Sequence, residues 1–460
     1  MAIYFVSLNE LDAQAGSLDP GFQTEVGANS EVHSILVLPN DQMLIGGRFT
    51  SYNNIDRNRL ARIDANGELD ENFIIGTGFE GEDKWVEVIT SSGQGGYYIG
   101  GVFSNYNGVD RNNVLRIDGN GDLDLDFNPG SGTVGIVLDI AVQSENKILI
   151  GGGFGKYNGQ TMRGLCRSLP DGSLDQTYIS LLNSEAVVNS IYVDNSFQSW
   201  IVGSFGSFDG QQVNKLALLL PNGGLNENFE QDKTCNSFID KIIPTSDGNF
   251  YIIGNFTEYD GKAVNKVAKI DGQGDLIEAF NVGAGPDYYP YDLAVQEDGK
   301  VIVVGDFTTF NNEPASRIVR LLSNGSIDPT FISGSGANGT ILSCKFQSDG
   351  KIIIGGYFNR YDGNTANRLA RLQNDLPTNT SSIQSNNVYK IYPNPASNSC
   401  FITGNHTNQP LDVKIFDYQG KLIKSFTTES NLDTSNLKDG VYLVQIMEGS
   451  HLTNLKIIVL

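Results

Sequence analysis

The sequence predicts an all-β fold: a seven-bladed β-propeller closed by an N-terminal strand and followed by a C-terminal β-sandwich. Three observations predict it. One short motif recurs seven times at a nearly constant spacing, short apolar runs alternate with tight-turn dipeptides, and the composition is that of a strand-rich protein. The 460 residues include 53 Gly, 24 Phe and 19 Tyr against 14 Pro, which is typical of many short strands joined by turns.

The recurring motif sets the period of the chain. Its last copy occupies residues 354–363, and its central phenylalanines are Phe49, Phe103, Phe154, Phe205, Phe256, Phe307 and Phe358. They are separated once by 54 residues and five times by 51. A self-similar period of about 50 residues is typical of a four-stranded propeller blade.

Two further positions recur around each phenylalanine. A glycine stands two residues before it, at Gly47, Gly101, Gly152, Gly203, Gly254, Gly305 and Gly356. An aromatic residue stands three residues after it, at Tyr52, Tyr106, Tyr157, Phe208, Tyr259, Phe310 and Tyr361. We interpret the glycine as the mark of a bulge or of a close approach between neighbouring blades, where a Cβ would clash. We expect the aromatic side chains to fill the wedge between blades, and only exposed members could stack on sugars.

A second series predicts how the ring closes. Segments similar to Ser-Leu-Asp-Pro-Gly-Phe lie at residues 17–22, 68–73, 122–127, 173–178, 224–229, 275–280 and 326–331. No such segment follows the last copy of the motif. We therefore expect the N-terminal segment to complete the last blade, so that no free sheet edge remains. The four strands of one unit are predicted at residues 32–39, 42–50, 58–64 and 69–73.

Opposite charges recur on the third and fourth predicted strands. The pairs are Arg62 with Asp70, Arg116 with Asp124, Arg167 with Asp175, Arg320 with Asp328, and Arg371 with Asp19 across the closure. Two units lack the pair, with Leu218 opposite Asn226 and Lys269 opposite Ile277. The second of these leaves the charge of Lys269 unpaired. We expect structural ion pairs here rather than catalytic groups.

The remaining segments complete the domain organisation. Residues 1–16 are predicted to be a leader or a signal remnant, residues 17–373 the propeller, residues 374–387 a polar linker, and residues 388–460 the sandwich. Strands of the last domain are expected at residues 388–392, 400–403, 411–416, 421–426, 441–447 and 451–460. No run of about 18 apolar residues occurs, so the sequence predicts no membrane span.

Charge and cysteine usage narrow the classes of function. The formal net charge of -22 argues against nucleic acid and anionic membranes as partners, and it suits solubility or counter-charge to divalent cations outside the cell. The cysteines Cys166, Cys235, Cys344 and Cys400 have no paired spacing, so no metal or redox motif is predicted. Cys344 replaces an apolar residue of the other copies and is expected to be buried.

Candidate metal sites are few. His33 is the only histidine before the linker, which argues against histidine triads and histidine metal sites, and we interpret it as an ordinary strand residue. Asp118, Asn120, Asp122 and Asp124 place oxygen side chains at alternate positions, as calcium loops do. A hairpin turn explains the same run, because an EF-hand loop would need a carboxylate where Pro129 stands. Apart from this possible Ca²⁺ site, no cofactor is predicted.

Candidate ligand residues come from two segments that depart from the repeat, residues 79–85 and 286–291. They contribute Trp85, Asp287, Tyr288, Tyr289 and Tyr291. Aromatic rings beside acids suit carbohydrate, and the blander alternative, which we prefer, is a different packing of these loops.

Two parts of the chain resemble known families. Residues 349–363 carry the signature D-G-K-I-x-I-G-G-x-F-x-x-Y-x-G, which resembles the delta-60 family of β-propeller repeats over residues 17–373. That resemblance implies an architecture and transfers no catalytic residues. Residues 392–395, 415–421, 433–437, 440–442 and 456–459 resemble the type A sorting domain of the type IX (Por) secretion system of Bacteroidetes.

The second resemblance implies a location and a partner. The type IX secretion machinery would recognise residues 388–460, cleave them, and release the rest or attach it to the cell surface. We therefore expect a secreted or cell-surface monomer that acts as a non-enzymatic binding or scaffold module for an extracellular glycan or protein. The alternative is a polysaccharide hydrolase or lyase with carboxylates or tyrosines on one face of the propeller.

Overall fold

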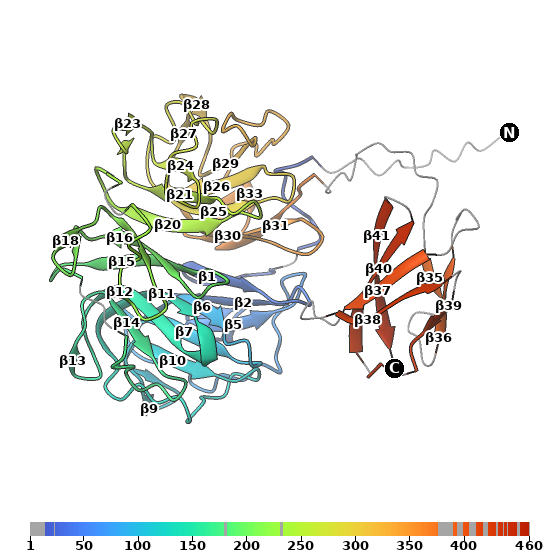
Figure 1. The fold of residues 1–460 in the computed structure, drawn as a ribbon, viewed down its shortest axis with the longest axis horizontal. Helices are drawn as coiled ribbons and strands as arrows, with labels where there is room; N and C mark the ends of the chain where they lie inside the picture. The colour runs from blue at the N-terminus through green and yellow to red at the C-terminus, as the bar shows by residue number, and fades with distance from the viewer. Residues whose placement is uncertain are drawn as a thin grey trace. The chain divides into compact units, whose positions relative to one another are not determined.

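The computed structural model describes residues 14–22, 24–178, 182–230 and 233–375 of the N-terminal part. Of the C-terminal part it describes residues 390–392, 399–403, 411–416, 422–428, 431–435, 437–438, 440–448 and 451–459. The chain divides into two compact units, Met1–Pro377 and Thr378–Leu460. Most of the predicted leader and of the predicted linker lies outside the described residues. The described residues form an all-β protein, with η1 (Ser144–Asn146) as their one short 3-10 turn (Figure 1).

The first unit repeats one plan of antiparallel pairing, in which the second of three strands lies in the middle of each sheet. The first strands are β1 (Val32–Val37), β6 (Trp85–Ser91), β11 (Thr133–Val142), β15 (Val187–Val193), β20 (Ile239–Pro244), β25 (Pro290–Val295) and β30 (Ile341–Phe346). The second strands are β2 (Met43–Gly47), β7 (Tyr97–Val102), β12 (Ile148–Tyr157), β16 (Ser199–Ser204), β21 (Phe250–Gly254), β26 (Val301–Gly305) and β31 (Ile352–Gly356). The third strands are β5 (Leu60–Ile63), β10 (Val114–Ile117), β14 (Leu165–Ser168), β19 (Leu216–Leu219), β24 (Val267–Ile270), β29 (Ile318–Leu321) and β34 (Leu369–Leu372).

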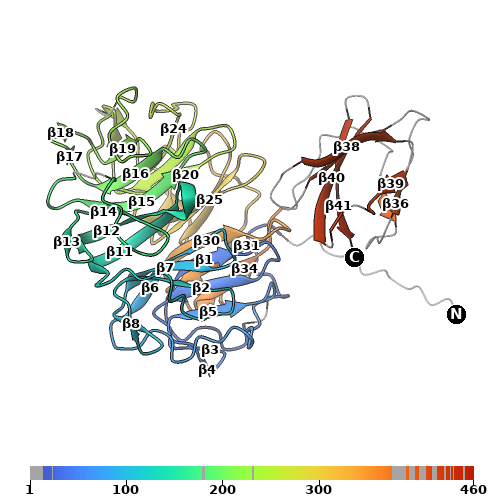
Figure 2. The ribbon, with the colours of Figure 1, turned by 60° about the horizontal axis from the view of Figure 1, so that its bottom comes forward.

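The first strands contact one another in chain order, and β30 also contacts β1. Figure 2 shows the same neighbourhood at the ends of this unit, where the orange β30 and β31 lie beside the blue β1. The described part of the chain therefore has the repeat arrangement of a β-propeller, with first strands lining its centre.

The predicted strand boundaries need two corrections. The second strand ends at the recurring glycine in most copies, and a short hairpin follows it. These hairpins are β3 (Ser51–Tyr52) with β4 (Ile55–Asp56), β8 (Asn105–Tyr106) with β9 (Val109–Asp110), the end of β12 with β13 (Gln160–Thr161), β17 (Ser207–Phe208) with β18 (Gln211–Gln212), β22 (Glu258–Tyr259) with β23 (Lys262–Ala263), β27 (Thr309–Phe310) with β28 (Glu313–Pro314), and β32 (Arg360–Tyr361) with β33 (Asn364–Thr365).

The second correction concerns the fourth strand, which is reduced to a single bridge in each copy. Leu69 pairs with Ile63 in this way, and Leu123 pairs with Ile117. The chain then bends at once, because the Asp70 carboxylate accepts a hydrogen bond from the backbone N–H of Asn72 at 2.9 Å. This side-chain turn competes with further pairing.

The N-terminal segment pairs with the last sheet as predicted. Leu18 forms the bridge to Leu372, the N–H of Asp19 donates to the carbonyl of Arg371 at 2.8 Å, and the N–H of Gln373 donates to the carbonyl of Ser17 at 2.8 Å. The bridge between Leu18 and Leu372 has the same place in its sheet as the bridge between Leu69 and Ile63.

The recurring aromatic residues are buried. Phe49 and Tyr52 are fully buried, and the Tyr52 hydroxyl donates to the carbonyl of Gly67 at 2.6 Å. Tyr106, Tyr157 and Tyr259 make the same bond to the glycine fifteen residues further on. In the last copy Tyr361 bonds instead to the carbonyl of Gly16, at 2.8 Å. In the five copies that have a tyrosine here, the hydroxyl therefore ties the hairpin to the turn that precedes the bridging segment, and the N-terminus supplies that turn for the last copy. Phe208 and Phe310 lack the hydroxyl.

All five predicted arginine–aspartate pairs are present, with shortest distances of 2.6 to 2.9 Å. Each arginine also reaches the next repeat; for example, Arg62 Nη1 donates to the carbonyl of Gly119 at 2.6 Å, and Arg371 Nη1 donates to that of Ala65 at 2.6 Å. The prediction that Lys269 is unpaired was wrong. Lys269 contacts the carboxylate of Asp247 at 3.2 Å, a residue of the turn before β21.

The second unit contains two antiparallel sheets. One sheet has the order β35 (Lys390–Tyr392), β36 (Ser399–Thr403), β39 (Asn431–Asp433), and the other has the order β38 (Leu422–Thr428), β37 (Leu411–Phe416), β40 (Gly440–Glu448), β41 (His451–Val459). One apolar cluster joins residues of both, including Ile402, Leu432, Val413 and Val444. The strand β39 was not predicted, because its three residues are too short for a periodic pattern.

Candidate functional site

Each first strand of the first unit contains a β-bulge opposite the recurring glycine. In β1 the register shifts between Val32 and Ser34, so His33 is the extra residue. A Cβ on Gly47 would lie 2.0 Å from the carbonyl oxygen of Glu31, which explains why no other residue stands there. The prediction of a bulge is confirmed. At Gly47 the close approach is between two strands of the same sheet. The close approach to the neighbouring sheet is made by the preceding glycine, because a Cβ on Gly46 would lie 2.5 Å from Val86 Cγ1.

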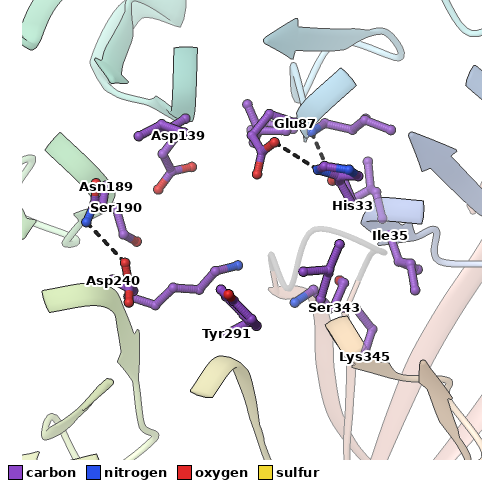
Figure 3. Close-up of a pocket in the computed structure, with 18 residues that line it drawn as sticks. His33, Ile35, Glu87, Asp139, Asn189, Ser190, Asp240, Tyr291, Ser343 and Lys345 are labelled. Carbon is purple, nitrogen blue, oxygen red and sulfur yellow. Dashed lines mark hydrogen bonds and ion pairs between the residues drawn. The ribbon is translucent and has the colours of Figure 1, made fainter. Parts of the chain in front are cut away.

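The bulge turns consecutive side chains toward the centre of the first unit, where they line a cavity of about 410 Å³ (Figure 3). A regular strand would turn only alternate residues to that side. The bulged residues that line the cavity are His33, Glu87, Leu138, Asn189, Asp240, Tyr291 and Leu342. Most of the residues that follow them also line it, namely Ser34, Val88, Asp139, Ser190, Lys241 and Ser343.

A first group of side chains in this cavity is centred on Glu87. Its Oε2 atom lies 3.0 Å from His33 Nδ1 and accepts a hydrogen bond of 2.8 Å from Trp85 Nε1. The guanidinium of Arg48 stacks on the Trp85 ring, 4.0 Å from its centroid. Burial alone would raise the pKa of Glu87, but the bonds from His33 and Trp85 outweigh burial and lower this pKa below its usual value.

A second group is centred on Asp292, whose side chain is buried just behind the cavity wall. Its carboxylate contacts Lys345 Nζ at 2.8 Å and Lys241 Nζ at 3.4 Å, and it accepts a bond of 3.0 Å from the backbone N–H of Cys344. Burial opposes the charge of Asp292, but the two lysines outweigh it and lower its pKa to about 2. Burial likewise opposes the charge of Lys241, yet Asp292 and Asp139 raise the pKa of its ammonium.

A third group holds two carboxyls whose pKa values are raised. Burial raises the pKa of Asp240 to about 7, and Lys241 offsets this only in part. Asp240 Oδ1 accepts a bond of 3.2 Å from the amide of Asn189. Burial also raises the pKa of Asp139, although its oxygens accept bonds of 2.7 and 2.8 Å from the backbone N–H groups of Ile191 and Ile140. Asp139 thus joins β11 to β15, and both of its oxygens are engaged. The described bond of Asp240 engages only Oδ1, so more of this carboxyl is available to a ligand in the cavity.

Of the five residues predicted to bind a ligand, the structure brings Tyr291 into the lining of this cavity and Trp85 next to it, where Trp85 contacts Glu87. The lining does not include Asp287, Tyr288 or Tyr289. Tyr289 lies between Tyr288 and Tyr291, at ring-centroid distances of 4.5 and 6.4 Å, and nearly parallel to Phe238 at 6.3 Å. Asp287 has a structural contact, because its carboxylate accepts bonds from the backbone N–H groups of Thr308 and Thr309.

The oxygen side chains predicted as a possible calcium site are engaged in a turn. Asp118 Oδ1 accepts bonds of 2.8 and 3.0 Å from the backbone N–H groups of Asn120 and Asp122, and Asp124 pairs with Arg116 at 2.6 Å. Over the described parts of the chain, no three His, Cys, Asp or Glu side chains come together in a way that could hold a metal ion.

Sequence reasoning missed His33, Glu87, Asp139, Asn189, Asp240 and Lys241 as site residues. A signal was available in the repeats themselves. The residue 17 positions before each phenylalanine is apolar in all seven copies, whereas the next residue is His, Glu, Leu, Asn, Asp, Tyr or Leu. Variable positions inside an otherwise uniform repeat mark side chains that do not take part in the shared framework.

Two protein-family models match parts of the chain. Residues 390–460 match the model of the secretion system C-terminal sorting domain. Residues 38–73, 95–127, 143–178, 296–331 and 347–376 match the model described as a domain of unknown function (DUF5122) beta-propeller. The predicted tail and repeat propeller are thus confirmed, and the name delta-60 stays a prediction. The sorting domain directs the protein through the type IX secretion system to the outside of the cell, where it is secreted or attached to the surface.

No curated protein matches this chain. Several solved structures are similar. The extracellular domain of BT4673 from B. thetaiotaomicron has 12% identity and a TM-score of 0.39 over 93% of this chain and 61% of that one. PorZ, an essential surface component of the type-IX secretion system of Porphyromonas gingivalis, has 14% identity and a TM-score of 0.29 over 94% and 66%. The extracellular domain of BT3049 from B. thetaiotaomicron has 14% identity and a TM-score of 0.39 over 93% and 68%.

The chain therefore spans less than two thirds of the length of the first two of these structures, at 61% and 66%. Separately, none of the described segments forms a helix of the length and hydrophobicity that crossing a membrane requires.

Proposed function

We propose that the protein is a non-enzymatic binding or scaffold module at the bacterial cell surface, built as a seven-bladed β-propeller closed by its N-terminal strand. The contact of β30 with β1 and the bridge between Leu18 and Leu372 support the closed ring. The shared apolar cluster of the second unit supports a β-sandwich for the sorting domain. We propose a monomer whose ligand is an extracellular glycan or protein.

This proposal rests on one contrast: residues of the repeated framework are the same from copy to copy, whereas residues that line the cavity differ. Framework positions such as Phe49 and Gly47 repeat around the ring, because each meets the same neighbours in every copy. The bulged positions differ in charge, size and polarity from copy to copy. The shared framework of the repeats does not require this variation, and a binding site for an asymmetric ligand would explain it.

A second candidate is a polysaccharide hydrolase or lyase, and one observation favours it. Asp240 has a pKa of about 7 and faces a cavity that Glu87 also lines. A carboxyl with a pKa near 7 is suited to general acid catalysis at neutral pH.

Binding and turnover distinguish the two candidates. We expect the full chain to be retained on glycans of a glycan array, or on an immobilised surface protein, without release of reducing sugar from any polysaccharide that it binds. Reducing-sugar release that Asp240→Asn abolishes, in a variant with an unchanged melting temperature, would instead establish the enzyme and overturn the binding module.

A further inference from the structure

The central cavity is lined by side chains of both signs of charge, which come from different strands around it (Figure 3). Glu87, Asp139 and Asp240 point into it from three different strands (Figure 3). Lys241 and Lys345 also line it, with side chains 39% and 40% exposed. We propose that this cavity receives the end of a neutral oligosaccharide, whose hydroxyls bond to Asp240, Glu87 and Lys241 while a sugar ring packs on Tyr289. This inference rests on the proposed binding function and names its ligand class.

The distribution of charge selects a neutral ligand. A cationic ligand would meet the ammonium groups of Lys241 and Lys345, and an anionic ligand would meet Glu87, Asp139 and Asp240. A charged ligand of either sign would also lose its hydration on entry, and incomplete pairing in the cavity would not offset this loss of free energy. A hydroxyl both donates and accepts, so one hydroxylated ligand can satisfy carboxylates and ammonium groups together.

Hydrogen-bonding capacity remains on the groups that face the cavity. Both described bonds to Glu87 end on Oε2, and the described bond to Asp240 ends on Oδ1. Because the pKa of Asp240 is about 7, this carboxyl is available near neutral pH both as a donor and as an acceptor. Asp292 differs, since two lysines and the backbone N–H groups of Leu293 and Cys344 already surround its carboxylate.

Aromatic rings lie where the chain enters the first strands. Phe238 and Tyr289 have equivalent places in successive repeats, 51 residues apart, and their rings are nearly parallel at 17°. Tyr288 is 51% exposed and packs edge-on against Tyr289. The apolar face of a sugar ring packs on the face of an aromatic ring, here that of the half-buried Tyr289, while its hydroxyls remain free for the polar side chains of the cavity.

The size of the site limits the length of the bound segment. A volume of about 410 Å³ lies near the lower end of the range of small-molecule sites, roughly 300–1,000 Å³. The cavity thus suits the end of a chain, about one or two sugar rings, and not the middle of a polymer.

The test uses the full chain and titration calorimetry. The probes are neutral gluco-, manno-, galacto- and xylo-oligosaccharides, together with oligogalacturonates as an acidic series and chitosan oligomers as an amino series. We expect a neutral series to bind, and Asp240→Asn and Tyr289→Ala each to weaken binding by about tenfold or more. Two matched controls, Asp260→Asn at a hairpin tip of the same repeat and Phe197→Ala in the exposed turn between β15 and β16, should change affinity by less than about twofold.

The outcomes separate this inference from the function on which it rests. Binding of the acidic or amino series alone overturns the neutral class and leaves the binding module intact. Neutral binding that neither variant weakens overturns the site, and no binding of any series overturns the ligand class. Neutral binding followed by cleavage supports the ligand class and overturns the non-enzymatic function.

Discussion

Arg320 shows at the scale of one residue why the repeated ion pairs are structural. Its side chain is fully buried, and it contacts Asp328 at 2.8 Å, Asn374 at 2.7 Å and Thr330 at 2.8 Å. It also lies over the ring of Phe331. A charge buried in this way is stabilised only by its partners, so each partner depends on the others.

We therefore expect Arg320→Ala to lower the free energy of unfolding by about 3–5 kcal/mol, because it leaves the carboxylate of Asp328 buried without its guanidinium. Urea denaturation measures this loss. The control is Lys262→Ala, which removes a side chain from an ion pair with Glu278. The two side chains are 50% and 66% exposed, so solvent weakens this pair and the loss of stability should be much smaller. Equal losses in both variants would contradict the structural role of the buried pair.

The aspartates of these pairs predict acid sensitivity. Burial opposes the ionisation of Asp19, Asp175 and Asp328. Bonds from backbone N–H groups, from Lys351 to Asp19 and from threonine hydroxyls to the other two, together with the paired arginines, outweigh burial and lower the three pKa values. A folded-state pKa below the unfolded value means that the unfolded chain binds more protons as the pH falls. The stabilisation is thus complete above about pH 4 and is lost as the pH falls through the folded-state values.

We expect the urea midpoint of the wild type to fall steeply below about pH 4, and less steeply in Asp328→Asn, which has already lost one of these charges. Denaturation at several pH values between pH 7 and pH 3 tests this. Because the raised pKa values of Asp139 and Asp240 contribute with the opposite sign, the comparison between the two proteins decides: an equally steep fall below about pH 4 in the wild type and in Asp328→Asn would be inconsistent with the lowered pKa of Asp328.

At the scale of the element, the bulge and its glycine act together. The bulge carries the backbone of the first strand toward the second, and only a residue without a Cβ fits opposite it. In the fourth repeat a Cβ on Gly203 would lie 2.1 Å from the carbonyl oxygen of Val187. Three residues further on, a Cβ on Gly206 would have nothing within 4 Å.

This contrast provides a matched pair of variants. We expect Gly203→Ala to destabilise the protein by about 1–3 kcal/mol or more, because the backbone of β15 must move. Gly206→Ala should be neutral or slightly stabilising, since it only restricts the unfolded chain. Melting temperatures of the two variants compare them, and a stable Gly203→Ala would show that the bulge can relax without cost.

At the scale of the whole molecule, the two ends of the first unit meet. The segment from Gln14 to Asp19 bonds to Thr330, Ile332, Tyr361, Arg371 and Gln373. Its loss would expose the edge of β34 and leave Arg371 buried without Asp19.

We expect deletion of residues 1–24 to lower the melting temperature by several degrees or more, in line with the loss of a buried ion pair and an edge segment. Deletion of residues 1–13 is the control and should have no such effect, because it retains the pairing segment from Gln14 onward. An unchanged melting temperature after the longer deletion would argue against closure by the N-terminal strand.

The sequence by itself determined the period of the repeats, the place of Phe49 and Gly47 within them, the ion pairs such as that of Arg371 with Asp19, and the exported tail. These features are local or repeated, so every copy supplies the same evidence. Only the tertiary structure decided the site. Side chains 51 or 54 residues apart, such as His33 and Glu87, meet because the first strands contact one another in succession. The bulge also interrupts the two-residue alternation by which a strand's inward face is normally recognised.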